Sequence, residues 1–194
     1  MKNFLLVFVV ALTGCVAGQN INLQYDPTPK QGTVLHQTVA VTVEDKRSYV
    51  TDGDKKPWYI GHYRAGFGNT WDVTTRDKVP FATQVKADLQ KELTSLGFTE
   101  GSDSHAKRVT VVIKDWNFDA MVNGKLWYDL EITVQSSDGA VLATSDVKDQ
   151  RVIKGSFWTG AKGAMTEEVP VMYGEALQAL IRNNAPIMEA LRKT

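Results

Sequence analysis

The sequence has only one cysteine among its 194 residues, and that cysteine is residue 15. One thiol cannot form a disulfide within the chain, so a disulfide-stapled fold is excluded. It also cannot supply the several thiolates of a cysteine-rich zinc site. An unpaired thiol is a liability in an oxidising compartment, so the position of Cys15 near the start of the chain calls for an explanation.

The chain also lacks an excess of charge of either sign. Acidic and basic side chains number 22 each, and neither forms a long block. This balance argues against nucleic-acid binding and against a polybasic membrane patch. After Gly14 no apolar run approaches the ~18–20 residues of a membrane-spanning helix. We therefore expect a soluble body, with any membrane attachment at the N-terminus.

Familiar catalytic patterns are absent as well. The sequence has no nucleophile elbow, phosphate-binding glycine loop, zinc-binding helix motif or paired-carboxylate signature. The histidines, His36, His62 and His105, have no metal-ligand spacing. Asp129 and Glu131 share one face of an expected strand, where solvated charge is the ordinary explanation. We predict no catalytic residues, no cofactor and no metal site, and a hydrolase is the least favoured interpretation.

What the sequence does contain begins with an export signal. Lys2 precedes an uninterrupted apolar stretch, Phe4–Leu12, which is too short to span a membrane and suits a signal-peptide core. The tetrapeptide from Leu12 to Cys15 resembles the bacterial lipoprotein box. The resemblance implies that residues 1–14 are a signal peptide and that Cys15 carries a diacylglyceryl group and an acylated amino group. A plain secretory signal with an incidental cysteine is the alternative.

The residue after the cysteine bears on localisation. In Gram-negative bacteria aspartate at this position favours retention at the inner membrane, whereas this chain has Val16. The resemblance therefore implies a lipid anchor in the outer membrane, with the domain facing the periplasm. Two or three acyl chains exceed the marginal membrane affinity of one chain.

The mature chain is predicted to form one globular domain. Residues 15–37 are polar and contain Pro27 and Pro29, which predicts a lipidated tether. A short strand at Ile21–Gln24 is compatible with this prediction. Residues 38–194 form the domain. The composition is that of an ordinary globular protein, for which one domain is the natural count.

Hydrophobic periodicity predicts the elements of this domain. Alternation predicts strands over 38–44 and 125–135, and β-branched content predicts one over 108–116. Turn residues at 136–139 lead into a further strand at 140–147, which forms a hairpin with 125–135. Apolar residues at intervals of four predict a helix from Pro80 to Leu96, stopped by Gly97. A second helix is expected over 167–181, broken at 183–186. We therefore predict an α+β fold, with an antiparallel sheet of about four strands and two main helices on one face.

The most unusual stretch lies within residues 45–76, a loop-like segment with a possible edge strand at 58–64. It concentrates large side chains that favour interfaces and sugar stacking. One interpretation buries these rings as a satellite core, and the other exposes some of them as a binding surface that Trp127 and Trp158 could join. The candidate surface comprises Trp58, Tyr59, Tyr63, Arg64, Phe67 and Trp71.

Several motifs in order resemble a known family. They are the lipoprotein box, TVAVTVEDKR at 38–47, LTSLGF at 93–98 and NGKLWYDLEITVQSSDG at 123–139. Together they are similar to the YajG-type family of bacterial envelope lipoproteins. The resemblance implies an outer-membrane or periplasmic lipoprotein with no established catalytic residues and an uncharacterised activity.

These observations favour a non-catalytic, lipid-anchored protein that binds another envelope component. Its partners would be the membrane, through the acyl chains, and an envelope protein or glycan, with no nucleic acid. The alternative is a carbohydrate-binding module for peptidoglycan or lipopolysaccharide that uses the same aromatic side chains.

Overall fold

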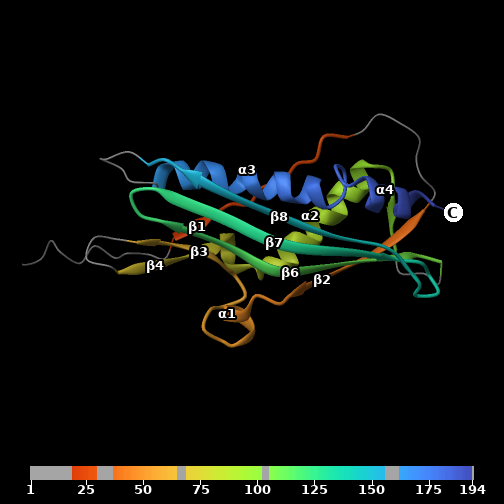
Figure 1. The fold of residues 1–194 in the computed structure, drawn as a ribbon, viewed down its shortest axis with the longest axis horizontal. Coiled ribbons are helices and arrows are strands. Elements are labelled where there is room, and N and C mark those ends of the chain that lie inside the picture. Colours follow the sequence, from red (N-terminus) through yellow and green to blue (C-terminus); the bar gives the residue numbers. More distant parts are fainter. Residues whose placement is uncertain (1–18, 30–36, 65–68, 102–104, 156–161, 194) are drawn as a thin grey trace, which may run out of the picture.

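The computed structural model describes residues 19–29, 37–64, 69–101, 105–155 and 162–193 (Figure 1). Over these residues the chain forms an eight-stranded mixed sheet with three helices of eight or more residues. The strands are β1 (Gln19–Ile21), β2 (Thr38–Asp45), β3 (Tyr59–Arg64), β4 (Thr70–Thr75), β5 (Thr99–Glu100), β6 (Lys107–Ala120), β7 (Gly124–Gln135) and β8 (Val141–Ile153). The helices are α1 (Ser48–Thr51), the 3-10 turn η2 (Arg76–Lys78), α2 (Phe81–Ser95), α3 (Lys162–Leu180) and α4 (Ala185–Arg192).

The centre of the sheet is the long strand β6. On one side it pairs antiparallel with β7, which pairs antiparallel with β8. On the other side it pairs parallel with β2 along 107–113 and parallel with β3 at Asp119 and Ala120. From β3 the sheet continues through antiparallel β4 to parallel β1, and β5 extends β2 in parallel.

The predicted antiparallel four-stranded sheet is therefore wrong. The predicted strands and helices exist, but β2 and β6 run parallel because α2 lies between them in the chain and carries it back across the sheet. Such a crossover is the usual way to join parallel strands. The segment 45–76 also holds two further strands, β3 and β4, which form an antiparallel pair.

Each face of the central strands has its own character. Along β7 the even-numbered residues from Leu126 to Val134 are buried and the odd-numbered ones are partly or fully exposed. The buried face packs under α2, α3 and α4, so these three helices cover one side of the sheet. We call the other side the open face; of the described helices, α1 contacts it where Tyr49 donates a hydrogen bond to Asp115 of β6. Burial along β7 follows the alternation that the sequence pattern predicted for a half-buried strand.

The ends of α2 and α4 are set by residues that favour helix termini. The stripe Phe81, Val85, Leu89 and Leu93 of α2 is buried, and Gly97 follows in a left-handed conformation (φ 92°) that glycine adopts most readily. Asn184 caps α4, accepting a hydrogen bond from the Ile187 amide. The break expected at 183–186 thus separates α3 from α4.

The folded part of the chain starts earlier than the tether assignment implied. β1 pairs with β4, and Ile21, Leu23 and Tyr25 are buried in the core. Residues 19–25 are therefore part of the domain, and the strand lies at Gln19–Ile21, earlier than the predicted Ile21–Gln24. Only three residues separate Cys15 from Gln19, where this strand begins.

Candidate functional site

The structure distributes the predicted aromatic surface between the core and the exterior. Tyr59 and Tyr63 are buried, at 3% and 7% exposure. Tyr63 packs against Phe118 with ring centroids 5.5 Å apart. Trp58 and Trp71 are half-buried, while Phe67 and Trp158 lie outside the described residues. Two of the six candidate residues thus belong to the core, which matches the satellite-core interpretation for those two.

Arg64 is the candidate residue that is most clearly on the surface. Its guanidinium forms a bidentate ion pair with Asp119, with Nε–Oδ1 and Nη2–Oδ2 distances of 2.8 Å and 2.5 Å. This charge-assisted pairing lowers the pKa of the Asp119 carboxyl. His62 also faces Asp119, at 3.3 Å from Nε2 to Oδ1. Arg64 is therefore committed to an ion pair within the chain.

Tyr59, His62 and Asp119 form a chain of polar contacts in which a hydroxyl, an imidazole and a carboxylate follow one another, as in a catalytic triad. Tyr59 Oη lies 2.9 Å from His62 Nδ1 and 3.1 Å from the Asn117 amide oxygen. Burial lowers the pKa of His62, although Asp119 opposes the shift, and burial raises the pKa of Tyr59. Tyr59 is consequently a buried, protonated hydroxyl at neutral pH, which suits a hydrogen-bond donor and not a nucleophile.

The open face of β6, β7 and β8 carries a row of side chains with mutual contacts. Trp127 is half-buried and donates its indole N–H to Asp115 at 2.7 Å, with the Lys125 ammonium 5.3 Å from its ring centroid. Two ion-pair groups continue along the same face. They are Lys114 with Glu131 and Asp146, at 2.6 Å and 2.7 Å, and Lys148 with Asp129, at 2.8 Å.

Asp129 and Glu131 do not form a carboxylate pair for acid–base chemistry. Each is neutralised by a lysine of a neighbouring strand across the sheet. Cross-strand pairs of opposite charge contribute modestly to sheet stability. The strands β6, β7 and β8 thus present on their open face a charged surface held together by cross-strand ion pairs, with one large aromatic side chain, Trp127.

A shallow cleft lies at the end of the sheet where β6 turns into β7. Its volume is about 280 Å³, and its lining includes Arg64 and Asp119 together with Met121, Asn123, Gly124, Lys125 and Val152. The turn itself exposes Met121 and Val122, at 54% and 56%. Val152 is 67% exposed on β8, directly opposite Lys125. Apolar side chains are unusually exposed at this end of the molecule.

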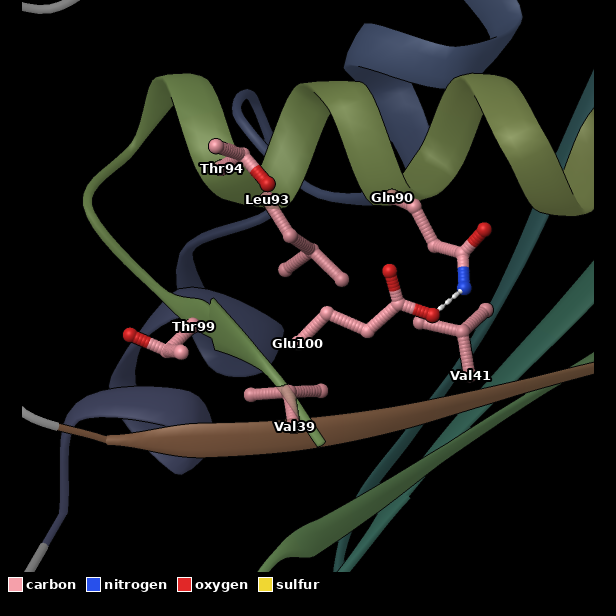
Figure 2. Close-up of a pocket in the computed structure, with 7 residues that line it drawn as sticks. All are labelled: Val39, Val41, Gln90, Leu93, Thr94, Thr99 and Glu100. Atoms are coloured by element: carbon pink, nitrogen blue, oxygen red, sulfur yellow. Dashed lines mark hydrogen bonds between the residues drawn. The ribbon is translucent and has the colours of Figure 1, made fainter. Parts of the chain in front are cut away.

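A second hollow between α2 and the strands β2 and β5 is too small for a ligand. Figure 2 shows Leu93 of α2 facing Val39 and Val41, with Gln90 hydrogen-bonded to Glu100 at its rim. The volume is about 10 Å³, which holds one water molecule at most. This hollow is a packing defect of the core edge.

A buried ionic cluster on α2 was not predicted from the sequence. Asp88 and Glu92 are both 0% exposed, one turn apart. Asp88 accepts hydrogen bonds from Tyr173 at 2.8 Å and Gln84 at 2.6 Å, and it pairs with Lys91 at 2.7 Å. Charged residues on a helix usually face solvent, so periodicity gave no signal for these two.

The other half of this cluster fastens the N-terminal segment. Glu92 accepts a hydrogen bond from Tyr25 at 2.6 Å and pairs with Arg182 of the segment after α3 at 2.6 Å. Arg182 also donates to the Thr28 carbonyl at 2.9 Å. Burial raises the pKa of Tyr25 and Tyr173, with Glu92 and Asp88 adding to the shifts. The cluster is saturated with partners, which indicates a structural role.

Within the described part of the chain, no three acidic, histidine or cysteine side chains gather as a metal site would require. None of the helices found there is long and apolar enough to cross a membrane. Cys15, the predicted lipidation site, lies outside the described residues.

Comparisons with known proteins identify the fold. No family model and no curated protein matches the sequence. Among solved structures, a DUF330 protein from Xanthomonas campestris matches with a TM-score of 0.55 and 11% identity, over 89% of this chain and 93% of its own. An uncharacterized protein matches with a TM-score of 0.50 and 9% identity, over 84% and 96% of the two chains.

A minor lipoprotein from Acinetobacter baumannii gives a TM-score of 0.46 and 9% identity, over 84% of this chain and 98% of its own. At such low identities the first two similarities show a shared fold alone. The YajG-type resemblance of the sequence motifs remains a prediction.

Proposed function

We propose that this chain is a lipid-anchored, non-catalytic protein of the bacterial cell envelope. The observation that carries the proposal is the tetrapeptide Leu12–Cys15, which begins at the last residue of the apolar stretch Phe4–Leu12. This order is that of an export signal followed by a lipid-attachment cysteine. Acylation would consume the only thiol of the chain and provide its hold on the membrane.

The outer membrane is the proposed location, with the domain in the periplasm. Support comes from Val16, since the residue after the lipidated cysteine influences sorting and aspartate there favours the inner membrane. Because the fold begins at Gln19, soon after Cys15, the lipid anchor would hold the domain close to the bilayer.

The proposed role is to bind another envelope component and not to catalyse a reaction. The titratable groups that come together in the described residues favour this role. Asp88 and Glu92 are buried and saturated with partners, and Tyr59 is held in its protonated form. A hydrolytic site needs an accessible nucleophile or base near a substrate cleft.

The open face of β6, β7 and β8 is the proposed contact surface. Helices α2, α3 and α4 pack on the other face of the sheet, and α1 reaches this face where Tyr49 donates a hydrogen bond to Asp115. Trp127 provides the kind of partly exposed aromatic side chain that often dominates binding energy. The surrounding ion pairs would form a polar rim. Burial of Tyr59 and Tyr63 removes two rings from the earlier candidate surface and with them much of a sugar-stacking platform.

In-cell photo-crosslinking tests the contact surface. A photoreactive residue at Gln150, which is exposed and directly opposite Trp127 on the open face, should capture a discrete envelope partner. The matched control is Lys86, which is exposed on α2 on the helical side. Equal capture from both positions, or from neither, would contradict the proposed surface.

A further inference from the structure

The exposed apolar residues concentrate at the end of the sheet where β6 turns into β7. We call this the hairpin end and define it by Met121, Val122 and Asn123, by Val152 of β8 and by Lys154, which follows β8. Figure 1 shows the β6–β7 turn and the end of β8 at the same end of the molecule. Three of the five large apolar side chains that the described residues expose are found here, namely Met121, Val122 and Val152.

Positive charge accompanies these apolar groups. Lys125 and Lys154 are exposed, and neither forms an ion pair with a described residue. The only acidic side chain in the lining of the cleft, Asp119, is already neutralised by Arg64. Exposed apolar tips flanked by lysines have the chemistry that anionic lipid surfaces attract.

Strand directions show that the chain enters the fold from the hairpin end. β3 runs toward this end because it is parallel to β6, with His62 opposite Asp119. β4 runs the other way, and β1 is parallel to β4. The start of β1, Gln19, is therefore the end of that strand which lies nearest the β6–β7 turn.

The pairing register gives the distance along the strands. Gln19 pairs with Val73, and Val73 pairs with Gly61, the residue before His62. Gly61 adjoins Phe118, three residues before Met121. At ~3.3 Å per residue this places Gln19 about 10 Å along the strand axis from the turn. Three residues lie between Cys15 and Gln19, and the four Cα–Cα steps from one to the other span at most about 14 Å. β1 lies three strands from β6 in the sheet, about 14 Å to the side, so an acylated Cys15 can reach the level of the hairpin end along the strand axis, beside the β6–β7 turn.

We infer that the hairpin end rests on the phospholipid surface in which the Cys15 acyl chains are embedded. Met121 and Val122 enter the interface between headgroups and acyl chains, and Lys125 and Lys154 face anionic headgroups. The acyl chains supply the affinity, and the hairpin end fixes the orientation of the domain. The open face of β6, β7 and β8 then stands away from the membrane plane. This inference rests on the lipid anchor proposed above.

Lipid-borne quenching tests the orientation in the acylated protein. Acylation occupies Cys15, so a Met121→Cys variant provides one free thiol for a fluorophore. The labelled protein is reconstituted into vesicles of phosphatidylethanolamine and phosphatidylglycerol that carry a nitroxide-labelled lipid. The matched control is Val141→Cys, which is 60% exposed in the β7–β8 turn region at the opposite end of the sheet.

We expect quenching at position 121 to exceed that at 141 several-fold. It should decrease when phosphatidylcholine replaces phosphatidylglycerol, and also in a variant with Lys125→Glu and Lys154→Glu. Protein that floats with the vesicles but shows equal quenching at both positions, or none at 121, would overturn the inference and leave the anchor proposal intact. Protein that carries no acyl group and does not float would overturn the anchor proposal, and this inference with it.

Discussion

Substitution of Glu92 by glutamine should destabilise the domain far more than a change of one charge on its surface. Glu92 is 0% exposed and accepts hydrogen bonds from Tyr25 and from the Arg182 guanidinium. Glutamine keeps the size of the side chain. It removes the charge and replaces one acceptor oxygen by an amide that cannot accept a hydrogen bond.

The magnitude follows from the burial of the two partners. Breaking a buried ion pair by removing one charge costs about 3–5 kcal/mol. The Arg182 side chain is 24% exposed, so water compensates part of its lost partner, and the lower limit applies. We expect a loss of about 3 kcal/mol in the free energy of unfolding. For a domain of this size this corresponds to about 6–12 °C in Tm.

The assay is urea unfolding of the unacylated Cys15→Ser protein, followed by tryptophan fluorescence. The matched control is Glu44→Gln, because Glu44 pairs with Lys46 on the surface with side-chain exposures of 45% and 60%. This control should change stability by less than about 0.5 kcal/mol. A second variant, Arg182→Met, completes a double-mutant cycle, and the coupling should exceed about 1 kcal/mol. Equal losses for Glu92→Gln and Glu44→Gln would refute the reasoning.

Four further predictions concern the anchor, the packing and the pH dependence. Cys15→Ser should abolish acylation and membrane flotation, because the thiol receives the lipid, and an unmodified wild-type N-terminus in intact-mass spectra would refute the lipoprotein assignment. Leu89→Ala should cost about 2–5 kcal/mol in urea unfolding because Leu89 is fully buried, whereas Lys86→Ala on the exposed side of α2 should cost little, and similar losses would contradict the packing. Tyr63→Ala should cost about 3 kcal/mol through its lost packing, and Arg64→Ala less than about 1 kcal/mol, so the reverse order of thermal midpoints would place Tyr63 outside the core. Burial raises the pKa of all six tyrosines, so above about pH 10 the unfolded chain releases protons that the folded chain keeps. The free energy of unfolding should therefore decrease as the pH rises above about 10, whereas the tyrosines should not change it at lower pH. An unchanged urea midpoint from about pH 9 to 11 would contradict this.

Local periodicity was sufficient to locate the long elements. The alternation along 125–135 and the four-residue stripe of α2 predict β7 and α2 to within one or two residues. The direction in which strands pair is not encoded in such patterns, since a strand has the same alternation whether its neighbour is parallel or antiparallel. The fold class was therefore missed even though most of its parts were found. β4 was missed because its six residues show only two buried side chains.

The candidate site was less predictable, for a different physical reason. Burial of a charged or aromatic side chain depends on partners far away in the sequence. Asp88 looks like a solvated residue on α2, yet it is fully buried and accepts a hydrogen bond from Tyr173 of α3. Tyr63 looks like an interface residue, yet Phe118 covers its ring from β6. Only the three-dimensional arrangement brings these pairs together.

The direction in which β1 enters the sheet also determines how the domain bears mechanical force. A pull on the N-terminal tether acts along the strand axis, so the hydrogen bonds between β1 and β4 are loaded together in shear and not opened one at a time. Beyond this short ladder, the buried side chains of Leu23 and Tyr25 and the bond from Tyr25 to Glu92 take up the load. The attachment therefore resists extraction in two successive stages, and the second stage reaches into the helical layer.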